Sequence, residues 1–294
     1  MAEYKKTGSC KVLVVTGCMA QRYKNEIIEE VPEVDAVLGT TSYGDILKAI
    51  REAMEGKHFQ EFKDIDYLPE KLGKRVLTTG GHFGYLKIAE GCDKHCTYCI
   101  IPKLRGKFRS VPMERLVTQA KEMAEEGVKE LILVAQETTV YGTDIYGKKS
   151  LHILLKELCK IKGIRWIRVL YCYPEEIYDE LIQTMKEEKK ICHYLDLPIQ
   201  HASDRILKRM GRRTTQAELV EIVNKLRREI PDIVLRTTLI SGFPGETQED
   251  HEELMSFVDE MEFDRLGVFT YSPEEDTPAA TMPDQVAEEV KEAR

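Results

Sequence analysis

The sequence predicts an α/β fold, namely a partial β/α barrel of the TIM type with six strand–helix units, preceded by part of a smaller α/β domain. Two observations predict it. From about residue 84 onward, short apolar runs rich in β-branched residues alternate with segments of helical period. The intervening segments are long enough to be crossover helices between parallel strands. An open, doubly wound sheet is the competing architecture.

Each element of the barrel is expected from its own segment. The strands are expected at 85–89, 130–135, 165–171, 194–199, 233–240 and 265–271. The helices are expected near 113–126, 151–160, 175–189, 203–210, 215–230 and 248–261. Thr215 and Glu218 form a capping-box pattern at the start of one helix, and Thr247 with Asp250 resembles a weaker cap.

The first part of the chain predicts a small α/β unit, with strands at 11–17 and 36–39 and helices at 22–31 and 45–55. Because two strands cannot bury both faces of a parallel sheet, this unit is expected to be part of a larger domain. The organisation that follows is a partial domain, a linker, the barrel and the start of a second linker. Their expected bounds are 1–57, 58–83, 84–282 and 283–294.

Composition narrows the class of protein. Hydrophobic residues make up 42% and charged residues 32%, a balance that is typical of soluble globular proteins. No apolar run approaches the roughly 18 residues that span a bilayer, and the first residues do not resemble a secretion signal. We therefore expect a cytoplasmic protein without a membrane partner. The net charge of −8 argues against a broad nucleic-acid-binding face.

Three of the eight cysteines fall in the segment GCDKHCTYC, directly after the first barrel strand. Cys92, Cys96 and Cys99 have the spacing C-x3-C-x2-C, and three thiolates can bind three irons of a cubane cluster. The fourth iron is then left open to bind a small molecule. The alternative is a structural zinc site that adds His95 or His82, although zinc sites more often pair two C-x2-C knuckles.

With Tyr98 before the last cysteine, this loop resembles that of the radical S-adenosylmethionine (SAM) superfamily. The resemblance implies a 4Fe–4S cluster whose open iron binds the amino and carboxylate groups of SAM. It further implies reductive cleavage of SAM to a 5′-deoxyadenosyl radical, which can remove hydrogen from an unactivated carbon. A flavodoxin- or ferredoxin-type protein is the expected electron donor.

The resemblance extends to the radical SAM methylthiotransferase family. The segments EGCDKHCTYCIIPKLRGKFRS, ISGFPGET and VTGCMAQRY are similar to motifs of that family. It implies that Cys18 is the third ligand of a second 4Fe–4S cluster, whose other two cysteines would lie upstream. Cys10 does not match either of those positions. The family's TRAM domain would begin after about residue 285, so we expect a truncated part of a longer enzyme.

Two subfamilies remain. MiaB-like enzymes modify an adenosine in tRNA, and RimO-like enzymes modify the β-carbon of an aspartate in small-subunit ribosomal protein S-twelve. The segment AQETTVYGTD and the pair Gln200–His201 resemble the RimO type. We therefore expect S-twelve or the small ribosomal subunit as the partner, with tRNA as the alternative. A non-catalytic zinc-binding module is the alternative from another class.

Four further residues are predicted to bind the cofactor. Gln136 and Glu137 end the second barrel strand, where the superfamily often contacts the amino group of SAM, although Glu137 could also be a helix cap. The resemblance implies that Gly242 lies in a turn whose backbone approaches the adenosyl group, but it could equally be an ordinary turn residue. Arg236 could bind a carboxylate or form a structural ion pair.

The remaining polar and sulfur-bearing positions have less specific patterns. Lys103 and Lys107 read as residues of a solvated basic loop, and Arg105 in the same loop is left open. His201 could orient the target aspartate, although a hydrogen-bonded core histidine is more common. The other cysteines in apolar surroundings are expected to be core residues; these are Cys159, Cys172 and Cys192.

Overall fold

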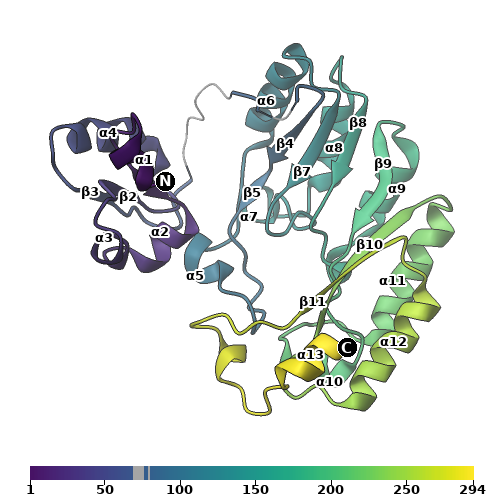
Figure 1. The fold of residues 1–294 in the computed structure, drawn as a ribbon. Helices are drawn as coiled ribbons and strands as arrows, with labels where there is room; N and C mark the ends of the chain where they lie inside the picture. Colours follow the sequence, from purple (N-terminus) through teal and green to yellow (C-terminus); the bar gives the residue numbers. More distant parts are fainter. Residues whose placement is uncertain (69–75, 79) are drawn as a thin grey trace. The chain divides into compact units, whose positions relative to one another are not determined.

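The computed structural model describes residues 1–68, 76–78 and 80–294. The chain forms two compact units, which are treated separately below (Figure 1). The first comprises residues 1–75 and 101–107, and the second comprises residues 76–100 and 108–294. None of the helices in the described ranges has the length and apolar character needed to span a lipid bilayer.

The first unit is built on a three-stranded parallel sheet in the order β1-β2-β3. Its strands are β1 (Val14–Thr16), β2 (Ala36–Leu38) and β3 (Phe59–Glu61). Its helices are α1 (Glu3–Thr7), α2 (Cys18–Tyr23), α3 (Glu26–Glu30), η1 (Tyr43–Asp45), α4 (Ile46–Met54) and α5 (Ile101–Arg105). Two apolar clusters around β2 bury it completely, one with Ala49 and Phe59 and one with Ala20 and Val34.

Two expectations for this unit were wrong. The helix expected at 22–31 is two short helices, because the chain turns at Lys24, whose φ of 44° is left-handed. The linker expected at 58–83 begins with β3, which pairs with β2 in register Ala36 to Phe59. Three residues are too few to show a period in the sequence. Within the same expected linker, residues 69–75 and 79 lie outside the described residues.

The second unit contains a six-stranded parallel sheet in the order β11-β10-β9-β8-β7-β4. Its strands are β4 (Phe83–Lys87), β7 (Glu130–Val134), β8 (Trp166–Val169), β9 (Ile191–Asp196), β10 (Val234–Ser241) and β11 (Arg265–Thr270). Among the strands of this sheet, neighbours in space thus follow one another in chain order. Since crossovers are right-handed, a sequential order puts all the helices on one side of the sheet, as in a β/α barrel. The predicted fold class is confirmed, and the doubly wound alternative is wrong.

Four of the crossover helices pack one against the next outside the sheet. Contacts join α6 to α8, α8 to α9 and α9 to α11. The described helices of this unit, of which the last two follow the final strand, are α6 (Met113–Glu125), α7 (Thr143–Tyr146), α8 (Leu151–Cys159), η2 (Pro174–Glu176), α9 (Asp179–Glu187), α10 (Asp204–Arg209), α11 (Gln216–Glu229), α12 (Gln248–Met261), η3 (Pro278–Thr281) and α13 (Glu288–Ala293). Both predicted caps are complete capping boxes, at Thr215 of α11 and Thr247 of α12.

A two-stranded ribbon sits at the base of the cysteine loop. Strand β5 (Ala89–Glu90) pairs antiparallel with β6 (Arg109–Ser110). Cys92 follows this ribbon directly. The loop therefore leaves the barrel at the carboxyl end of β4, the end at which β/α barrels carry their active sites.

Candidate functional site

The three-cysteine loop is fixed by contacts from the second half of the barrel. The backbone N–H of Thr97 donates to the carbonyl of Met210 (2.9 Å), and its hydroxyl donates to the carbonyl of Arg209 (2.8 Å). Tyr98 packs edge-on against Phe243, with ring centroids 6.4 Å apart, in a cluster that includes Met210. The tyrosine in the motif is thus an anchor for the loop.

The three cysteines of the loop differ in their exposure to solvent. Cys92 and Cys96 are buried, and Cys99 is half-buried. Burial raises the pKa of the Cys92 thiol to about 11. A thiol is therefore the stable form without a metal, and a metal must displace the proton to gain a thiolate ligand.

A cavity of about 200 Å³ opens beside Cys92. Its walls mix apolar and charged side chains from several strand ends. They are Cys92, Asp93, Lys94, Phe108, Glu137, Val140, Thr143, Glu176 and Arg213. A pocket that combines apolar walls with a few converging charged groups is typical of a ligand site.

Glu137 is the buried carboxylate of this cavity, with 1% of its surface exposed. Its Oε1 accepts hydrogen bonds from the N–H (2.9 Å) and the hydroxyl of Thr139. Its Oε2 has no hydrogen-bond partner among the described residues. Burial raises the pKa of Glu137 to about 7, against the lowering effect of the Thr139 hydroxyl. A buried carboxylate oxygen without a partner is suited to a cationic ligand group.

The neighbouring Gln136 is half-buried, and within the described ranges its Oε1 is likewise buried without a partner. Glu137 lines the cavity, and Gln136 directly precedes it just after the end of β7, where the sequence placed both residues. Together with three thiols on one loop, they fit a cluster that holds a ligand with an amino group. Within the described part of the chain, no three His, Cys, Asp or Glu side chains converge on a single metal ion. Because each thiolate of a cubane binds a different iron, this finding does not test a cluster.

Gly242 lies in a tight turn after β10, with φ of +76°. Its N–H and that of Phe243 both donate to Oε2 of Glu246, at 2.7 and 3.0 Å. Burial raises the pKa of Glu246, but His201 and these backbone donors outweigh it and leave the pKa below its usual value. The sequence did not single out Glu246, which holds this turn in shape.

His201 and Arg236 both have protein partners. His201 is wholly buried; its Nδ1 accepts the N–H of Ser203 (3.0 Å), and its Nε2 lies 3.6 Å from Glu246. Arg236 forms an ion pair with Asp196, with 2.5 Å between Nη1 and Oδ1. His201 is thus a hydrogen-bonded core histidine and Arg236 is part of a structural ion pair, each of which was one of two interpretations of the sequence. The cofactor role of Arg236 stays a prediction.

Cys18 and the basic segment belong to the first unit. Cys18 is the first residue of α2, and Nε of Arg105 in α5 donates to its sulfur over 3.1 Å. Lys103 lies on the same short helix as Arg105. The sequence left Arg105 open, and no local pattern could have linked two residues that are 87 positions apart.

Of the three cysteines expected in the core, Cys172 is buried, whereas Cys159 and Cys192 are only half-buried. Burial raises the pKa values of Cys159, to about 12, and of Cys172 and Cys192.

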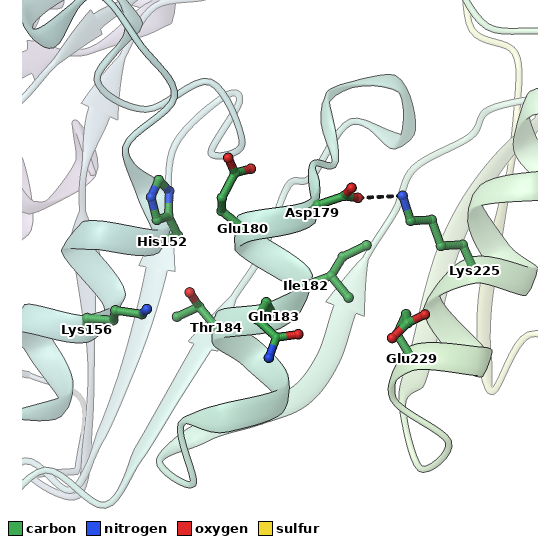
Figure 2. Close-up of a pocket in the computed structure, with 9 residues that line it drawn as sticks. All are labelled: His152, Lys156, Asp179, Glu180, Ile182, Gln183, Thr184, Lys225 and Glu229. Atoms are coloured by element: carbon green, nitrogen blue, oxygen red, sulfur yellow. Dashed lines mark hydrogen bonds and ion pairs between the residues drawn. The ribbon is translucent and has the colours of Figure 1, made fainter.

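A larger cavity, of about 680 Å³, lies on the outer layer between α8, α9 and α11 (Figure 2). Its lining includes His152 and an ion pair of 2.5 Å between Asp179 and Lys225, and it contains no cysteine.

Comparisons with known proteins agree with this geometry. The family model of the radical SAM superfamily matches residues 86–258. Among solved structures, the cobalamin-dependent radical enzyme OxsB superposes with a TM-score of 0.65 at 14% identity, over 95% of this chain and 42% of that one. The methyltransferase TsrM from Kitasatospora setae gives 0.56 at 16% identity, over 67% and 38%. The fold and the site define a radical SAM protein.

Curated relatives narrow the family. Proteins named ribosomal protein uS12 methylthiotransferase RimO match from Lachnoclostridium phytofermentans at 68% identity and from Clostridium perfringens at 56%, each over the whole chain. Clostridioides difficile has one that is 53% identical over 99% of the chain. The chain belongs to the RimO family of radical SAM methylthiotransferases, as its motifs predicted. It spans 67%, 66% and 65% of the lengths of these relatives.

Proposed function

We propose that the protein adds a methylthio group to the β-carbon of an aspartate in ribosomal protein uS12, called S-twelve above. The observation that carries this proposal is the three-thiol loop beside Glu137, whose Oε2 has no partner among the described residues, in a chain 68% identical to a RimO protein. The names of the relatives favour uS12 over tRNA as the substrate, and an enzyme over a non-catalytic zinc-binding module.

Cys92, Cys96 and Cys99 would hold the cluster, and Glu137 and Gln136 would receive the amino group of SAM. Bound there, the cluster and SAM supply a carbon radical that removes hydrogen from the substrate. Burial of Cys92 and Cys96 shields two of the three proposed ligand sulfurs from water. The Gly242 turn, fixed by Glu246, offers a backbone surface to the adenosyl group.

The target side chain is a carboxylate, and the cavity offers a cation for it. Arg213 is exposed on the cavity wall. A guanidinium binds a carboxylate in a planar, two-point geometry and fixes its orientation. We propose that Arg213 holds the target aspartate with its β-carbon toward the cavity.

Other parts of the activity are proposals from the family resemblance. Cys18 would be one ligand of a second cluster that supplies the sulfur, and a flavodoxin or ferredoxin would supply electrons. The first unit and the barrel, expected at 84–282, would work with a TRAM domain. Since its substrate is a ribosomal protein, we place the enzyme in the cytoplasm.

The experiment is mass spectrometry on cells that lack the gene and on the same cells with the gene restored. We expect uS12 to lose the mass of a methylthio group in the deletion strain and to regain it on restoration. The tRNA nucleosides, digested from the same cells, serve as the control and should not change. Loss of a methylthio-adenosine from tRNA with unchanged uS12 would replace this proposal with the MiaB-like one.

A further inference from the structure

Tyr173 touches the middle cysteine of the loop. It follows β8 and immediately precedes η2, so it comes from a different strand end than the cysteines. Its hydroxyl lies 3.5 Å from Sγ of Cys96, which is buried. In the free protein either atom could donate. A sulfur bound to iron is a thiolate without a proton, so there the tyrosine hydroxyl must be the donor.

A buried cation lies on the same tyrosine. The guanidinium carbon of Arg212 is 4.2 Å from the centroid of the Tyr173 ring, and the Arg212 side chain is 1% exposed. One nitrogen donates to the carbonyl of Pro198 (3.1 Å) and lies 3.8 Å from Glu175. Nε and Nη1 of Arg212 have no hydrogen-bond partner in the part of the chain that the structure describes.

Such a buried, incompletely paired guanidinium is costly unless negative charge lies near it. Lys94 also lies 5.0 Å from the same ring, but its ammonium group is paired with Glu176, so Arg212 is the relevant cation. A cluster held by three thiolates carries negative charge, and reduction adds one more electron to it. Positive charge and a donated hydrogen bond stabilise the reduced form more than the oxidised form, which raises the reduction potential.

We propose that Tyr173 is a positioning residue for the cluster: its hydroxyl, supported by Arg212, orients the sulfur of Cys96 and raises the reduction potential of the cluster. This inference rests on the proposed cluster at Cys92, Cys96 and Cys99. The iron and sulfide content of the unsubstituted protein tests that cluster first and independently.

The experiment compares the whole chain with its Tyr173→Phe variant after anaerobic reconstitution with iron and sulfide. Sodium dithionite supplies one electron per cluster in a potentiometric titration followed by electron paramagnetic resonance. The signal that changes on addition of SAM identifies the cluster with the open iron. We expect the reduction equilibrium constant of Tyr173→Phe to fall about tenfold, which is a midpoint about 59 mV more negative.

Three further variants make the result specific. Tyr178→Phe is the matched control, because Tyr178 is half-buried like Tyr173 but its hydroxyl contacts His152 instead of the loop. The potential of this variant should not change. Arg212→Gln should shift the midpoint in the same direction as Tyr173→Phe, and Arg212→Lys should restore most of it. If Tyr173→Phe holds less iron than Tyr178→Phe, the positioning role is supported directly. An unchanged potential with an unchanged iron content, or an equal shift in Tyr178→Phe, would overturn the proposal.

Discussion

The two units contain cysteines in opposite situations. In the second unit, three cysteines share one loop at the carboxyl end of β4, and a tyrosine, a buried carboxylate and a buried guanidinium surround them. In the first unit, Cys18 stands at the start of α2 with Arg105 as its partner. Cysteine thus forms the proposed ligand set in the second unit, whereas Cys18 occupies a single position in the first.

The comparison teaches what makes a cysteine informative in a sequence. A loop with three cysteines at fixed spacing defines a ligand set without any long-range contact. A single cysteine acquires a role only from partners elsewhere in the chain or in another part of the protein. The predictions below test that distinction, beginning with the largest effect.

Removing one thiol of the loop should destroy the site. In Cys96→Ala, we expect loss of the iron that changes its spectrum with SAM, and loss of SAM cleavage, because two thiolates cannot hold the cluster. Iron and sulfide analysis of the reconstituted protein measures this. Cys192→Ala is the control, because Cys192 is a half-buried thiol outside the loop whose pKa is raised by burial. This variant should keep its iron. Equal iron in both variants would refute the ligand assignment.

Replacing the buried carboxylate should separate binding from stability. Because folding raises the pKa of Glu137 from an ordinary 4.5 to about 7, the folded state favours the protonated form. Below about pH 4.5 the Glu137 carboxyl is protonated in both the folded and the unfolded state, so it does not affect stability. As the pH rises toward 7, the unfolded state loses this proton first, and Glu137 increasingly destabilises the folded state. At roughly 1.4 kcal/mol per pKa unit, Glu137→Gln should stabilise the metal-free protein by on the order of 3 kcal/mol at pH 7.

Urea unfolding at pH 4.5 and pH 7 measures this difference. In the reconstituted protein the same variant should bind SAM about tenfold more weakly, because a charged hydrogen bond to the amino group is lost. Glu176→Gln is a useful control, since Lys94 and Lys149 pair with that carboxylate and folding lowers its pKa despite its burial. A pH-independent gain in Glu137→Gln would contradict the account.

The smallest effects are expected in the first unit. Cys18→Ala should change the free energy of unfolding by about 1 kcal/mol or less, the usual value of one hydrogen bond. Its loop iron should equal that of the unsubstituted chain. Chemical denaturation and iron analysis of the same preparation measure both quantities. Loss of the loop iron in Cys18→Ala would show that the two cysteine regions depend on each other.

Local patterns predicted most of the barrel, because each strand and helix of the second unit has its own apolar period and several helices have their own caps. Thr215 and Thr247 sit at the observed helix starts for that reason. The short strand Phe59–Glu61 and the break at Lys24 were missed, since three residues show no period and a left-handed turn has no unique sequence.

The cysteine loop and Glu137 could be found from spacing and from position at strand ends. Tyr173, Arg212 and Glu246 could not. Tyr173 lies 77 positions from Cys96, and Glu246 acts on Gly242 through a turn whose shape appears only in three dimensions. Contacts of this kind depend on which strand ends the barrel brings together, and no local pattern contains that information.

The central claim is that the three-thiol loop holds a cluster with an iron open to SAM. The most direct measurement is the electron paramagnetic resonance spectrum of the anaerobically reconstituted, dithionite-reduced protein, recorded with and without SAM. The account predicts a cluster signal that changes when SAM is added and that is absent in Cys96→Ala. A protein that takes up zinc instead of iron, or a cluster signal that SAM leaves unchanged, would contradict it.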